Sequence, residues 1–153
     1  MSCLDHPEDL RDEELQLELS SFGTDPNHKV PTYYFRMVYA STGEELGHIR
    51  LRVHSNRHVE LYAGHVGYEV YEPHRGHRYA SRSIVLLRLL ALEHGINPLW
   101  ITCSPDNAAS RRTLEIVGAQ FIEIVDVPED CVIRRWGIVQ MCRYKLDTSA
   151  KSP

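Results

Sequence analysis

The most constraining feature of this sequence is an apolar helix between two short strands. Residues 65–71 alternate in the manner of a strand, residues 75–81 form a turn, and the helix then continues to about His94. Residues 99–103 follow as a short and almost wholly apolar strand, which is typical of an interior position. A crossover through a helix makes the two strands parallel or near-parallel neighbours. Where such strands diverge, a crevice opens at their carboxyl ends, and ligands bind there.

The remaining segments predict an α+β fold. Alternation of apolar and polar residues indicates strands at 15–19, 33–40 and 46–53, which meander into the strand at 65–71. After residue 103, Asp106 or Asn107 caps a second helix that ends at Gly118. Two closing strands follow at 121–127 and 138–146. We therefore expect a mixed, mostly antiparallel sheet of about seven strands with a central splay.

The composition indicates one globular domain over residues 1–153, with 42% hydrophobic and 25% charged residues. We expect residues 1–12 to be a loose acidic lead and residues 147–153 a frayed tail. The rest of the chain is nearly neutral, which does not favour nucleic-acid binding. No apolar run is long enough to span a membrane, and the first thirty residues lack the layout of a signal peptide. We therefore predict a cytoplasmic protein with reduced thiols at its four scattered cysteines, Cys3, Cys103, Cys131 and Cys142.

The turn before the long helix, Arg-Gly-His-Arg-Tyr-Ala at residues 75–80, is the strongest local signal for a ligand. A helix N-terminus exposes about four unpaired amide N–H groups and suits an anion. Gly76 permits a tight turn, and the small Ala80 and Ser81 allow a ligand to approach closely. Neither a nucleotide P-loop nor a dinucleotide fingerprint is present. The turn therefore predicts an anion site of another kind, with a plain strand-to-helix connection as the alternative.

Here the chain resembles the GNAT superfamily of acyl-CoA-dependent N-acyltransferases. Its signature, Arg/Gln-x-x-Gly-x-Gly/Ala, is matched at Arg75 and Ala80, whereas Arg78 stands where the family usually has glycine. We expect the φ angle of Arg78 to suit a residue with a Cβ atom. Asn107 and Gly118 fit the family's second block, and the resemblance covers about residues 33–146, including the order of strands. It implies a GNAT fold of the α/β/α type with the N-terminal helices reduced or absent.

The resemblance implies acetyl-CoA as co-substrate. Its pyrophosphate would bind the amides of residues 77–81, and its pantetheine arm would run along residues 68–71 like an extra strand. Asn107 would hold the pantetheine, with Ser110 beside it, and one of the nearby arginines, including Arg82, would meet the 3′-phosphate. The implied cofactor-binding residues are Tyr68, Val70, Tyr71, Arg75, Gly76, His77, Arg78, Tyr79, Ala80, Ser81, Thr102, Asn107, Ser110 and Arg111.

The implied reaction is attack of an amine on the acetyl thioester in one ternary complex. Glu69 is the candidate base, acting directly or through a water, and partial burial would make its carboxylate basic enough. An ordinary salt bridge or an anchor for substrate charge is the alternative role for Glu69. His65 shares its strand face and would then join the site. The amide of Val70 or Tyr71 would polarise the thioester carbonyl.

The family often carries a tyrosine as the acid seven residues after the helix asparagine, and here that position is Leu114. Cys103, Tyr79, Tyr71 or solvent would then protonate the departing thiolate. Two other readings of Cys103 stay open, a covalent acyl carrier and a buried structural cysteine.

The acceptor is expected to be a small-molecule amine, because an acidic lead and an open site suit a cation. Protein N-termini, protein lysines, or a non-catalytic acetyl-CoA-binding module are the alternatives. Residues 23–30 are too short for the family's usual pair of helices, so the pocket would be open or roofed by another subunit in a homodimer. The loop at 128–137, with Trp136, would form part of its rim or be a solvated connection. His54 and His58 are four residues apart in an expected hairpin turn, and no metal site is predicted.

Overall fold

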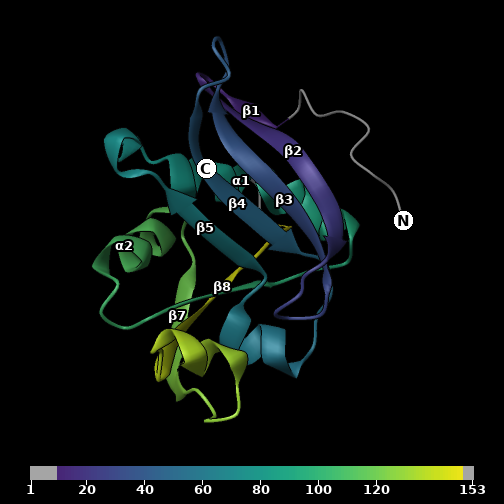
Figure 1. Ribbon diagram of the computed structural model, residues 1–153, viewed down its shortest axis with the longest axis vertical. Helices are drawn as coiled ribbons and strands as arrows, with labels where there is room; N and C mark the ends of the chain where they lie inside the picture. Colours follow the sequence, from purple (N-terminus) through teal and green to yellow (C-terminus); the bar gives the residue numbers. More distant parts are fainter. Residues whose placement is uncertain (1–9, 150–153) are drawn as a thin grey trace.

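The computed structural model describes residues 10–149 and contains two antiparallel sheets and two α-helices (Figure 1). The five-stranded sheet has the order β1-β2-β3-β4-β5, and the three-stranded sheet has the order β6-β8-β7. This is the α+β class that the sequence predicts. The elements are β1 (Arg11–Asp12), β2 (Leu15–Thr24), β3 (Pro31–Tyr39), β4 (Glu45–Arg52), η2 (Val59–Ala63), β5 (Val66–Val70), η3 (Glu72–His74), α1 (Tyr79–Glu93), β6 (Leu99–Cys103), α2 (Ala108–Ile116), β7 (Gln120–Asp126), η4 (Val132–Trp136) and β8 (Gln140–Leu146).

The predicted splay separates the two sheets. At its closed end, the His65 N–H donates to the Trp100 carbonyl at 2.6 Å, and the Trp100 N–H donates to His65 Nδ1 at 2.9 Å. Beyond this junction β5 and β6 share no ladder, because they belong to different sheets. The single mixed sheet expected from the sequence is therefore two sheets that diverge toward the carboxyl ends of β5 and β6.

The hydrophobic core lies between α1 and the sheets. Helix α1 is seen behind the five-stranded sheet in Figure 1 and buries Ile84 and Leu87 in the same cluster as Ile49 and Leu51 of β4. Full burial of such a side chain contributes roughly 1.5–3 kcal/mol. Gly95, with φ +75°, follows the last turn of α1 as the glycine after a helix commonly does. The crossover thus fixes the start of α1 against the end of β5.

The other face of the five-stranded sheet carries polar side chains. The side chains of Glu18, Arg36 and Glu69 on this face are 40–57% exposed. Only residues 25–30 connect β2 to β3, and no helix forms between these strands. The expectation that the N-terminal helices are reduced or absent is confirmed for the described residues, and within one chain no helix between β2 and β3 covers this face.

Two segments that we expected to be loose are ordered where the structure describes them. Leu10 is buried and Arg11–Asp12 pair with β2, while Thr148 is buried and its hydroxyl donates to the Ile96 carbonyl at 2.9 Å. For these described residues the expectation failed because it rested on polar composition, whereas Arg11–Asp12 form a hairpin with Leu15–Gln16 and Thr148 is held by Ile96, which is distant in sequence. Residues 1–9, with Cys3, and residues 150–153 lie outside the described residues. No described helix has the length and apolar character needed to cross a bilayer.

Candidate active site between the two sheets

The turn before α1 has the shape that the motif predicts, with one departure. Gly76 has φ +99°, and Arg78, the residue that precedes the first turn of α1, adopts the left-handed conformation at φ +60° and ψ +30°. The expectation that Arg78 would avoid this region is wrong. A left-handed conformation is about 1–2 kcal/mol less favourable for a residue with a Cβ atom. The chain therefore keeps the backbone shape that glycine would give, at some cost in stability.

The first amides of α1 are not capped by a side chain. No side chain in residues 10–149 accepts a hydrogen bond as the N-cap of this helix. The Ser81 hydroxyl instead donates to the Arg78 carbonyl at 3.1 Å, and the Arg82 N–H donates to the same carbonyl at 2.9 Å. The N–H groups of Tyr79, Ala80 and Ser81 are thus the unpaired donors that a helix start presents to an anion.

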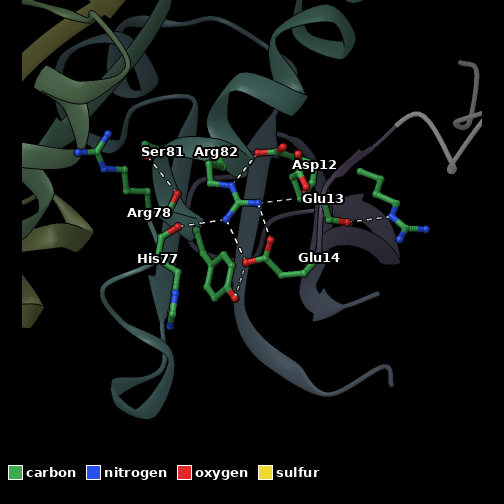
Figure 2. A network of polar contacts seen from close by, with 9 residues as sticks. Asp12, Glu13, Glu14, His77, Arg78, Ser81 and Arg82 are labelled. Carbon is green, nitrogen blue, oxygen red and sulfur yellow. Dashed lines mark hydrogen bonds and ion pairs between the residues drawn. The ribbon is translucent and has the colours of Figure 1, made fainter. Parts of the chain in front are cut away.

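Arg82 ties the turn to the segment at Asp12–Glu14 (Figure 2). Its Nε lies 2.6 Å from Asp12 Oδ2, its Nη2 lies 2.9 Å from Glu14 Oε1, and its Nη1 donates to the His77 carbonyl at 3.1 Å. The hydrogen bonds from Arg82 lower the pKa of Glu14 to about 2. The guanidinium of Arg82 is therefore already paired with two carboxylates, which makes it a weaker candidate for a phosphate than the alternatives.

Arg78 differs from Arg82 because its side chain is directed away from the network in Figure 2 and has no partner among the described residues. It lines a cavity of about 650 Å³ that runs from the turn, past the edge of β5, to the open sheet face. Most of the predicted site residues line the same cavity: Tyr68, Glu69, Val70, Arg75, Gly76, Arg78, Tyr79, Ala80, Thr102, Cys103, Asn107 and Ser110. Tyr71, His77, Ser81 and Arg111 do not.

The edge of β5 that faces the splay has free main-chain groups. The Arg52 N–H donates to the His65 carbonyl and the Tyr71 N–H donates to the Leu46 carbonyl, so every second residue of β5 bonds to β4. The alternation points the N–H groups of Tyr68 and Val70 toward the splay. The Tyr71 amide is already paired with β4, so our suggestion that it polarises a bound carbonyl is wrong.

Glu69 lies on the open face rather than in a partly buried position as expected. Its side chain is 57% exposed, and His48 Nε2 lies 3.3 Å from Oε1. Gly47 of β4 allows the backbone of β5 to approach closely here, because a Cβ atom there would overlap the Glu69 carbonyl oxygen and lie 2.9 Å from the Val70 Cα. The carboxylate therefore borders the cavity from the solvent side. His65, by contrast, is buried, and its Nε2 contacts the Ser55 hydroxyl at 2.9 Å, so it does not join Glu69 in the cavity.

Polar groups line the opposite wall of the cavity, at the start of α2. Asn107 is the N-cap residue, and its Oδ1 accepts from the Ser110 N–H at 3.0 Å. The Ser110 hydroxyl lies 2.5 Å from the hydroxyl of Tyr68, whose pKa is raised by burial to about 12. Burial also raises the pKa of Cys103 to about 11. All four side chains are thus uncharged near neutral pH.

The other suggested acids have partners away from the cavity. The Tyr79 hydroxyl donates to Glu14 Oε2 at 3.0 Å, and the Tyr71 hydroxyl donates to Glu45. Leu114, at the position where the family often has its tyrosine, is fully buried. Arg111 is turned to the Tyr144 hydroxyl at 3.1 Å, which explains why it does not line the cavity. Cys103 is the suggested acid that remains at the site.

The far end of the cavity, defined as the part lined by His28, Arg50, Arg52, Ile133, Trp136, Ile138 and Met141, combines three segments that are distant in sequence. The predicted contribution of Trp136 to a rim is confirmed. Reasoning from the sequence missed His28, Arg50 and Arg52. For the two arginines, the sequence feature that could have revealed them was the alternation of β4, which places Arg50 and Arg52 on the face opposite the buried Ile49 and Leu51.

Two features of the far end set its charge. Arg52 is almost completely buried, and its Nη1 donates to the Gly64 carbonyl at 2.8 Å, while burial lowers its pKa to about 10. His28 Nδ1 lies 2.7 Å from His58 Nε2, and burial lowers the pKa of His28 to about 4. His58 precedes the helical turn η2 rather than lying in a hairpin turn, and no metal-binding group of three or more side chains occurs among the described residues.

Comparison with known proteins identifies the family. The sequence model of the GNAT acetyltransferase domain matches residues 3–120. The chain belongs to the GNAT acetyltransferase family. No curated protein sequence matches this chain closely enough to count as a relative.

Solved structures of similar fold include several acetyltransferases. They include the microcin C7 self-immunity acetyltransferase MccE in complex with acetyl-CoA and AMP, at 17% identity and a TM-score of 0.57. The ribosomal-protein-S5-alanine acetyltransferase from Vibrio fischeri has 13% identity and a TM-score of 0.59, and a GNAT-family acetyltransferase from Bacillus anthracis has 19% and 0.58. The matches cover 76%, 80% and 76% of this chain but only 61%, 64% and 67% of those chains, respectively. At these identities the likeness concerns the fold.

Proposed function

We propose that this GNAT protein transfers the acetyl group of acetyl-CoA to a primary amine of a small molecule. One observation carries the proposal: the uncapped amides of α1 and the unpaired edge of β5 border the same cavity. A helix start suits the pyrophosphate, and a free strand edge suits the amide groups of the pantetheine arm. The bound acetyl-CoA of the MccE structure supports the same co-substrate here.

The cofactor would be held mainly by main-chain donors. The amides of Tyr79, Ala80 and Ser81 would bind the pyrophosphate, and that of Tyr68 would pair with the pantetheine, which leaves the Val70 amide for the thioester carbonyl. The Val70 carbonyl accepts from Arg75 Nε at 3.0 Å, which fixes the end of β5 next to the turn. Arg78 is the arginine best placed to bind a phosphate, because it has no partner among the described residues.

Glu69 would take a proton from the acceptor ammonium, directly or through a water. The amine nitrogen then attacks the thioester carbon, the C–N bond forms, and the Val70 N–H stabilises the oxyanion. The C–S bond breaks next, the nitrogen loses its second proton, and the thiolate gains one. An exposed carboxylate beside His48 suits proton exchange with water, which an enzyme that turns over repeatedly requires.

Cys103 would act as a proton donor to the leaving thiolate rather than as an acyl carrier. A thiol with a pKa of about 11 is protonated near neutral pH, and only the thiolate is an effective nucleophile. A covalent acyl-cysteine route therefore receives no support. Solvent is the alternative donor, because the cavity opens to the exposed face.

Calorimetric titration with acetyl-CoA tests the binding step. We expect Ala80→Asp to weaken binding at least about tenfold, because a carboxylate in the first turn repels the pyrophosphate; since Ala80 is buried, its thermal unfolding is measured first to show that the variant folds. Ala108→Asp, at the exposed start of α2, is the matched control and should bind normally. Absence of acetyl-CoA binding by the wild-type protein would refute the proposal.

Thiol release with a panel of amines then tests catalysis. The panel includes a peptide with a free N-terminal alanine, since one similar structure is a ribosomal-protein-alanine acetyltransferase. Release with small amines supports the proposal, and release with the peptide alone would make the protein N-terminus the acceptor. Binding without release for any amine would favour a non-catalytic module. The cytoplasmic location and the homodimer stay predictions.

A further inference from the structure

The cavity carries an excess of positive charge at both of its ends. Arg75 and Arg78 lie at the turn and Arg50 and Arg52 at the far end, whereas Glu69 is the only carboxylate among the described residues that line it. Under the proposed function the phosphates of acetyl-CoA neutralise the first pair. The second pair stands on β4 rather than at the turn, so it requires another explanation.

The charge at the far end is not balanced within the protein. Asp25 is the one buried carboxylate nearby, and its Oδ1 already accepts from the Asn27 and His28 amides. Its Oδ2 is 3.9 Å from Arg52 Nε, which has no hydrogen-bond partner. The negative charge of Asp25 can balance the positive charge of one guanidinium. His28 is neutral and balances none. A second guanidinium in a partly desolvated site is unfavourable unless an anion binds it.

Arg50 is that second guanidinium. Its head group lies over Gly67, where a Cβ atom would be 3.0 Å from its Cζ, and no carboxylate pairs with it in residues 10–149. Gly67 and Glu69 point to the same face of β5, two residues and roughly 7 Å apart. A ligand with an anionic group near Arg50 would therefore place its next few atoms beside Glu69.

The walls around Arg50 are apolar. Ile133, Ile138 and Met141 belong to or pack against a hydrophobic cluster of their own, and Trp136 stands next to His28, with ring centroids 6.1 Å apart. Such walls favour a ligand with a hydrocarbon or aromatic side chain. Because Arg50 is itself partly buried, its attraction for an anion is stronger than at a fully exposed site.

We propose that the acceptor is an apolar amine that also carries a carboxylate, such as a hydrophobic amino acid, with the carboxylate bound by Arg50 and the amine at Glu69. This inference rests on the proposed function and specifies its substrate. It replaces our argument from the acidic lead, because Asp12, the described acidic residue of that lead, is paired with Arg82 and does not line the cavity.

Matched amines test the role of the carboxylate. Phenylalanine and leucine are compared with phenethylamine and 3-methylbutylamine, which lack only the carboxylate, by kcat/KM in the thiol-release assay. A charged hydrogen bond contributes about 1.5–3 kcal/mol, so we expect a preference of roughly ten- to hundredfold for the amino acids. Equal or better use of the decarboxylated amines would overturn the inference and leave the acetyltransferase proposal intact.

Substitutions of Arg50 locate the effect. Arg50→Gln should remove the preference by raising KM for phenylalanine, with acetyl-CoA affinity unchanged and kcat/KM for phenethylamine little altered. Arg50→Lys should restore part of it. Arg112→Gln, on the exposed side of α2, is the matched control and should behave as wild type. A preference that survives Arg50→Gln would contradict the assignment.

A binding measurement separates this inference from the proposed function. Calorimetry of phenylalanine and of phenethylamine, each in the presence of CoA, reads the preference without turnover. Tighter binding of phenylalanine that is lost in Arg50→Gln would support the carboxylate site even if no amine released thiol. Failure of acetyl-CoA to bind would refute the acetyltransferase proposal, and equal binding of both amines would refute the carboxylate site.

Discussion

The two ends of the cavity are built in different ways. The turn end comes from one continuous segment, residues 75–81, and offers mainly main-chain donors at the start of α1. The far end combines residues 28, 50, 52 and 133–141 and offers side chains. Main-chain donors suit a ligand portion that is the same in every reaction, whereas side chains from separate segments suit a portion that varies. The turn end therefore fits the cofactor and the far end the acceptor.

Glu69 lies between the two ends, and its substitution should have the largest effect. We expect Glu69→Gln to lower kcat about 10²–10⁴-fold, the usual contribution of a general base. The affinity for acetyl-CoA, measured by calorimetry, should not change, because under the proposed function the cofactor would contact the edge of β5 rather than this exposed side chain. His48→Gln, which removes only the neighbour, should have a smaller effect. An unaltered kcat in Glu69→Gln would mean that Glu69 is an anchor and not a base.

The difference between an end built from one segment and an end built from several also explains which features could be predicted from the sequence. The turn, the crossover and Asn107 at the start of α2 were predictable because each depends on residues adjacent in sequence. The extension of β2 to Thr24 was not, since a register shift between Leu19 and Ser21 interrupts the alternation. Arg50 and Arg52 were visible as alternate residues of a strand, but whether they face solvent or a cavity depends on the loop at 127–139 that folds over them.

Gly47 tests whether the edge of β5 must be held in place. We expect Gly47→Ala to destabilise the fold by about 1–3 kcal/mol, because the added Cβ would force the Glu69 carbonyl and the Val70 Cα away from β4. Acetyl-CoA binding should weaken as well. Gly23→Ala is the matched control, since a Cβ there meets no atom within 4 Å. Thermal unfolding and calorimetry measure both effects, and equal behaviour of the two variants would show that β5 can shift freely.

Glu14 tests whether the network of Arg82 stabilises the turn end. The pKa of Glu14 falls from 4.5 to about 2 on folding, so its ionised form stabilises the protein above pH 4.5. This contribution is lost as the pH falls from 4.5 toward 2. We therefore expect Glu14→Gln to lower the melting temperature at pH 7, with the difference from wild type shrinking as the pH falls through that range. A difference independent of pH would exclude an ionic origin.

Arg78 provides the smallest effect and the sharpest test of the turn end, because stability and binding should change in opposite directions. Arg78→Gly should stabilise the fold by about 1 kcal/mol by relieving the left-handed conformation, yet weaken acetyl-CoA binding by removing a guanidinium from the cavity. Lys29→Gly is the matched control: Lys29 also has a positive φ, +62°, but does not line the cavity, so only stability should rise. Comparing CoA with 3′-dephospho-CoA identifies the group involved. If Arg78 binds the 3′-phosphate, wild type should prefer CoA and Arg78→Gly should not, whereas equal loss of affinity for both would assign Arg78 to the pyrophosphate.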